Sequence, residues 1–111
     1  MKKTLNELSE VVAKANDLFY DRNRDVDTLM GIMDKTLRKQ GINADAITID
    51  CIAVNKKIVL VLHDSKPDLV DIALGDKAGA IHSSTEHKLE DLNIVQILDM
   101  MEKNFLDSLD K

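Results

Sequence analysis

Apolar residues in the first forty positions recur at helical spacing and form two stripes. Members of the first stripe lie three or four residues apart: Leu5, Leu8, Val12, Ala15 and Phe19. The second stripe follows a polar break at residues 22–24: Val26, Leu29, Met30, Met33 and Leu37. This spacing puts each set on one side of a helix. We predict two N-terminal helices, the second beginning at Asp25 and ending before Gly41, since glycine is common just after a helix.

Between residues 47 and 74 the pattern changes to the alternation of β-strands. We predict strands at residues 47–54, 58–63 and 69–74, joined as an antiparallel meander. A two-residue turn at Asn55 and Lys56 would place Ile49 opposite Leu62, and a turn around Pro67 would place Ile72 opposite Leu60. One face of the sheet is then wholly aliphatic.

The last third of the chain predicts a C-terminal helix. Residues 80–83 could add a short fourth strand, and the helix could start at Ser83 or at Asp91. Its apolar positions are Ile94, Ile97, Leu98, Met101, Phe105 and Leu109. The predicted fold is a single α+β domain, residues 1–111, in the order α-α-β-β-β-(β)-α. It has two N-terminal helices, a meander of three or four strands and a C-terminal helix, arranged as a two-layer sandwich.

The second face of the predicted sheet needs a cover. A sheet of three or four strands is ~10–15 Å wide and helices pack ~8–10 Å apart, so two helices fill one face and a third is crowded. The second face would carry the apolar residues Ile52, Val59, Val61 and Ala73. Either the third helix or a partner chain must bury them. We expect a homodimer with these four residues in its interface.

Three ionisable residues share that second face in the predicted register. Asp50 and Asp71 would flank Val61 from opposite sides, and His63 lies two residues further along the central strand. An imidazole beside carboxylates can transfer protons, and the same three groups could ligate a divalent metal. The alternative is that all three are solvated. We treat Asp50, His63 and Asp71 as candidate ligand-binding residues and assign no catalytic or metal site.

Other candidate chemistry is weaker. His82 and His87 are five residues apart, so they would face different sides of a helix. Cys51 is the lone cysteine and fits a small core position. The glycine-bracketed loop at residues 75–79 does not have the order of a phosphate-binding loop. We therefore predict no cofactor.

Charge argues against polyanionic partners. The net charge is −5, and residues 43–111 carry seven basic against thirteen acidic side chains. Nucleic-acid binding would need a basic face on the first two helices, built from Arg22, Arg24, Lys35, Arg38 and Lys39. The basic residues 35–39 have a simpler explanation, because cations stabilise the end of a helix.

Location and function follow from what the sequence contains. The longest apolar run, residues 58–62, is too short to span a membrane. One cysteine and no export signal suit the cytoplasm. We expect a soluble, non-enzymatic protein-interaction or regulatory module that acts as a homodimer. The alternative is a small-ligand- or metal-binding protein, or an enzyme, that uses the His/Asp cluster.

Overall fold

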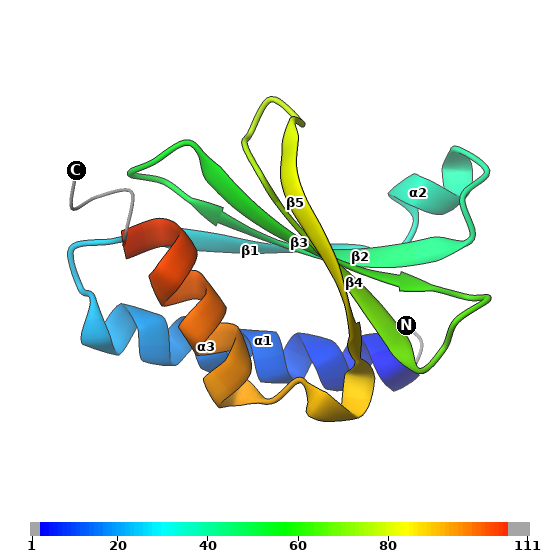
Figure 1. The fold of residues 1–111 in the computed structure, drawn as a ribbon, viewed down its shortest axis with the longest axis horizontal. Coiled ribbons are helices and arrows are strands. Elements are labelled where there is room, and N and C mark those ends of the chain that lie inside the picture. Colours follow the sequence, from blue (N-terminus) through cyan, green and yellow to red (C-terminus); the bar gives the residue numbers. More distant parts are fainter. Residues whose placement is uncertain (1–2, 107–111) are drawn as a thin grey trace.

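The computed structural model of the protein describes residues 3–106, which form an α+β fold with five antiparallel strands (Figure 1). The strands follow the chain across the sheet, from β1 to β5. The elements are α1 (Lys3–Arg22), β1 (Thr28–Met33), α2 (Thr36–Lys39), β2 (Ala44–Cys51), β3 (Lys56–His63), β4 (Leu69–Gly75), β5 (Ile81–Lys88), the 3₁₀ turn η1 (Leu89–Asp91), α3 (Ile94–Met101) and the π-helical turn η2 (Glu102–Leu106). Leu109, placed above in the last helix, lies outside the described residues.

The first helix is confirmed. All five residues of its predicted stripe, from Leu5 to Phe19, are buried on one side of α1. Its other side is exposed and mostly polar, as expected of a helix that covers a sheet.

The second predicted helix is wrong, because residues 28–33 form the edge strand β1. Met30 lies opposite Ile49 and Thr28 opposite Cys51 in an antiparallel pair with β2. The Thr28 hydroxyl also donates a hydrogen bond to the side-chain oxygen of Asn16 on α1. Pairing with β2 satisfies backbone hydrogen-bonding groups of β1. Such tertiary contacts override the local preference for a helix.

Only one helical turn, α2, remains of that second helix, and its predicted ending is confirmed. The Ile42 N–H donates to the Leu37 carbonyl at 2.9 Å and the Gly41 N–H to the Arg38 carbonyl at 3.1 Å. Gly41 has a φ of 85°. These are the features of a Schellman ending, which requires a left-handed residue and therefore favours glycine.

The predicted register between the first two meander strands is also wrong. Ile49 lies opposite Ile58, four residues before the predicted partner Leu62. The turn is the four-residue stretch 52–55 rather than Asn55 and Lys56, because Lys56 already belongs to β3. A shift of four is even, so every side chain keeps its predicted face. The apolar pattern cannot distinguish the two registers.

Strand β4 agrees with the prediction, and β5 is longer than predicted. Leu60 pairs with Ile72 and Val61 with Asp71, as expected. The uncertain fourth strand is longer than predicted, since β5 runs through Ser83 and Glu86 and excludes a helix start there. The C-terminal helix begins at Ile94, where the Asn93 side chain caps it by accepting a 2.9 Å hydrogen bond from the Gln96 N–H. Across residues 3–106, no helix combines the length and apolarity needed to cross a membrane.

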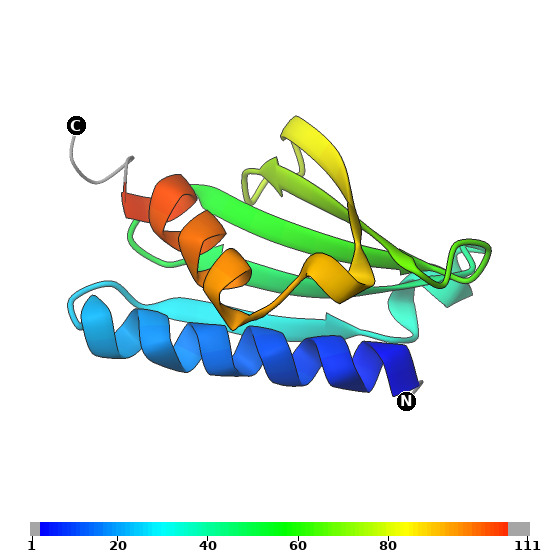
Figure 2. The ribbon, with the colours of Figure 1, turned by 60° about the horizontal axis from the view of Figure 1, so that its bottom comes forward.

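Both long helical segments pack on the same side of the sheet (Figure 2). The core joins residues of α1, α3 and η2 to alternate strand residues such as Ile49, Ile58 and Leu60. The Phe19 and Phe105 rings meet edge to face, with centroids 6.0 Å apart and planes at 85°. Because β1 replaces a helix, α1 and α3 fit over one face, and neither covers the other face.

The aromatic contact predicts how much the C-terminal segment contributes to stability. Replacing Phe105 with alanine should lower the free energy of unfolding by about 3–5 kcal/mol, because it leaves a cavity between α1 and η2. Val95→Ala on α3, where the side chain is 72% exposed, should change it by less than about 0.5 kcal/mol. Urea unfolding followed by circular dichroism measures both. Equal midpoints for the two variants would contradict this packing.

Candidate binding surfaces

The structure brings two of the three predicted ligand-binding residues together. His63 ends β3, and Asp71 lies on the neighbouring strand β4. The His63 Nε2 atom is 3.2 Å from an Asp71 carboxylate oxygen, and both side chains are more than one-third exposed. They form a polar pair at one end of the sheet face that α1 and α3 leave open.

The third residue, Asp50, lies at the other end of that face. In the observed register Asp50 is opposite Lys57, and the two form an ion pair of 3.8 Å. Lys57 and His63 are six residues apart on β3, which is roughly 20 Å along a strand. The predicted convergence depended on the incorrect register, so Asp50 does not join the His63–Asp71 pair.

No described cluster completes a metal centre. Among residues 3–106, no group of three or more histidine, cysteine, aspartate or glutamate side chains is arranged to hold a metal ion. His63 and Asp71 supply two donors, whereas zinc sites use three or four protein ligands. Cys51 is fully buried in the core, as predicted.

Three of the four predicted interface residues lie on this uncovered face. We call it the open face and define its centre by Val59 and Val61 on β3 and Ala73 on β4, all half-buried. Their neighbours in the core cluster point to the opposite side. Ile52 is not on the face, because it lies in the β2–β3 turn and is 53% exposed. The open face is therefore a narrow apolar strip across the central strands.

An arginine with two carboxylate partners fixes the end of the sheet near α2. The Arg38 guanidinium donates two hydrogen bonds to Asp45, both 2.9 Å, and two to Asp64, of 2.8 and 2.9 Å. Asp45 is only 3% exposed. The hydrogen bonds to Asp64 and Asp45 raise the pKa of Arg38 above its already high ordinary value. The guanidinium thus stays charged wherever the protein is folded.

The sequence pattern does not reveal this network, because Arg38 fits equally well as a cation at the end of a longer helix. A signal was present at Asp45, which alternates with Ile47 and Ile49 and therefore shares their apolar face. A carboxylate on a buried face requires a charged or hydrogen-bonding partner. Arg38 is also part of the basic cluster that was a candidate contact for nucleic acid. Its guanidinium is instead hydrogen bonded to Asp45 and Asp64.

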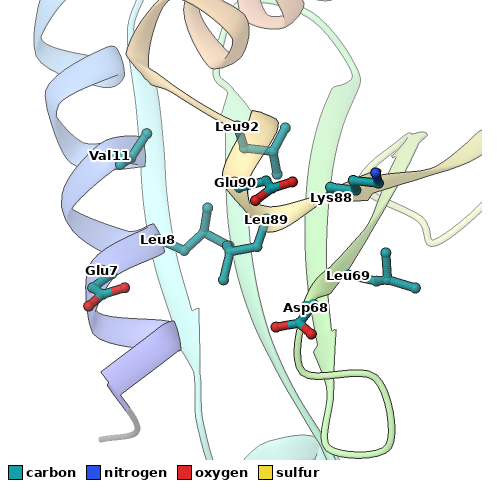
Figure 3. A pocket seen from close by; sticks show the side chains of 9 residues that line it. All are labelled: Glu7, Leu8, Val11, Asp68, Leu69, Lys88, Leu89, Glu90 and Leu92. Atoms are coloured by element: carbon teal, nitrogen blue, oxygen red, sulfur yellow. The ribbon is translucent and has the colours of Figure 1, made fainter.

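A groove lies between α1 and the chain that connects β5 to α3 (Figure 3). Its volume is about 590 Å³. Its aliphatic lining residues are Leu8, Val11, Leu69, Leu89 and Leu92, and its charged ones are Glu7, Asp68, Lys88 and Glu90. Sequence reasoning missed it because three distant segments form it, and two of them were assigned to a loop and a helix start.

The Arg38 network should stabilise the fold more than an exposed ion pair does. Arg38→Ala leaves the buried Asp45 carboxylate without its guanidinium, and buried charges that lose a partner are strongly destabilising. Arg22→Ala is the matched control, because Arg22 is 59% exposed and its Glu102 partner is 3.5 Å away. We expect Arg38→Ala to lower the urea midpoint clearly more than Arg22→Ala. The reverse order would show that the network does not anchor the sheet.

Comparisons with known proteins give no relative from which a function could be transferred. No family model, curated protein or solved structure matches the chain. The function must therefore be argued from the open face, the Arg38 network and the groove themselves.

Proposed function

We propose that the protein is a non-enzymatic interaction module that acts as a homodimer through its open face. The observation that carries this proposal is the half-buried strip of Val59, Val61 and Ala73, which α1 and α3 leave uncovered. Apolar side chains that stay partly exposed on a sheet face can be buried by a partner, and such surfaces are used as interaction sites.

The arrangement of charge around the strip supports an interface. Asp50 and Lys57 pair at one end, and His63 and Asp71 pair at the other. The apolar centre thus lies between polar ends, which is the usual anatomy of a protein–protein interface. Lys57 balances the charge of Asp50 at one end, and the His63 imidazole lies beside Asp71 at the other.

A second copy of the chain suits this surface. A two-fold interface joins a patch to itself, so the patch must be self-complementary. With a two-fold axis running across the strands, Asp50 and Lys57 of one copy would meet the His63–Asp71 end of the other. Sheets packed face to face lie ~10 Å apart, close enough for the valine side chains to interdigitate.

The proposal predicts that the open face determines the oligomeric state. Sedimentation velocity at micromolar concentration should give about twice the chain mass of 12.4 kDa for the unchanged protein. Val61→Lys and Val59→Lys should each give a monomer, because two ammonium groups would be buried at the two-fold axis.

Val95→Lys provides the matched control, since it makes the same change at an exposed position on α3. It should leave the dimer intact, and urea midpoints should show that all three variants fold. A monomer mass for the unchanged protein would overturn the proposal. So would a dimer that both open-face lysines fail to weaken.

A further inference from the structure

The groove lies between α1 and η1 (Figure 3). Its lining shares residues with the core, so it is on the helical side of the sheet and separate from the open face. Leu8 and Leu92 in its lining belong to the core cluster, and Leu89 packs against that cluster. A ligand in the groove would therefore contact the core directly. The proposed dimer leaves it accessible.

The walls of the groove are fixed by backbone hydrogen bonds. The Leu89 N–H donates to the Asp68 carbonyl at 2.9 Å, which ties η1 to the start of β4. The Leu92 N–H donates to the Leu89 carbonyl at 3.1 Å and closes the 3₁₀ turn. Because α3 begins only at Ile94, a single short turn spans this region and leaves the space beside α1 unfilled. The groove is thus preformed.

Its rim is acidic. Three carboxylates, on Glu7, Asp68 and Glu90, surround the apolar floor with one ammonium group, on Lys88. Within the described part of the chain, Glu7 pairs with the exposed Lys3 at 3.9 Å, and such exposed pairs contribute little to stability. Within residues 3–106, neither Asp68 nor Glu90 forms a side-chain ion pair. The rim therefore has unmatched negative charge beside half-buried aliphatic side chains.

We infer that this groove binds a short amphipathic segment of a partner protein that carries aliphatic side chains flanked by lysine or arginine. The aliphatic side chains would pack on Val11, Leu69 and Leu89, which are half-buried, and the cations would reach the rim carboxylates. The charged groups lie on the rim of a half-open groove, whereas small-molecule pockets enclose their ligand around convergent polar groups. A helix laid in a groove is a common mode of peptide recognition.

The test uses the full chain and two synthetic twelve-residue peptides of leucine and lysine or of leucine and glutamate, both arranged for an amphipathic helix. In ¹⁵N–¹H spectra, the lysine peptide should shift the amides of Leu8, Val11, Leu69 and Leu89. The affinity should fall as salt is added, because exposed charges are screened. The glutamate peptide should cause no such shifts.

Charge reversal on the rim separates this site from general attraction to an acidic protein. The double variant Glu7→Lys, Glu90→Lys should weaken the lysine peptide at least about tenfold, equivalent to about 1.4 kcal/mol. Glu10→Lys, on an exposed position of α1 outside the groove, should weaken it far less.

Three results would overturn the inference. They are no binding of the lysine peptide at millimolar concentration, shifts that centre on Val59 and Val61 instead, and equal weakening by Glu10→Lys and the double variant. Val61→Lys should leave peptide binding unchanged. A failure of the groove and a failure of the open-face dimer can therefore be told apart.

Discussion

The fold depends on one shared apolar surface between the sheet and two helical segments. Alternate residues of β2, β3 and β4 supply one side of it, while α1, α3 and η2 supply the other. The edge-to-face contact of Phe19 and Phe105 joins the two helical segments across that surface. Because burial of apolar area is the main favourable term in folding, this side of the sheet holds the helices. The opposite side is left with its own valines and paired charges.

The sequence predicted the parts of the fold that depend on local periodicity and even-numbered strand alternation. The α1 stripe, the β3–β4 register and the faces of the central strands all follow from these patterns. Strand β1 could not be found this way. Val26, Met30 and Met33 are three or four residues apart, which favours a helix over a strand, whose faces repeat every two residues. Only pairing with β2 decides between them.

The candidate sites also divide into features that local patterns predict and features that depend on contacts between distant segments. The pairing of His63 with Asp71 was predictable because it depends on a correct register, whereas Asp50 was misplaced by a shift of four residues that leaves the apolar pattern unchanged. The Arg38 network and the groove require contacts between segments far apart in the chain. Only Asp45 indicates the Arg38 network from the sequence, because a carboxylate on an aliphatic face needs a partner.

The structure thus separates two kinds of surface on opposite sides of the sheet. The open face is apolar at its centre and has a polar pair at each end, and the proposed homodimer rests on this arrangement. The groove is apolar at its floor and acidic at its rim, which suits a cationic partner. The open face and the groove both exist only if α1 and α3 pack on the same side of the sheet.

Nuclear Overhauser contacts between side chains test that placement most directly. The account predicts contacts between the rings of Phe19 and Phe105, and contacts from the methyls of Ile58 and Leu60 to the helical segments. It predicts none between α1 or α3 and the methyls of Val59 or Val61 on the same strand. Intramolecular contacts from either helix to those two valines would contradict the account, because the open face would then be covered by the protein itself.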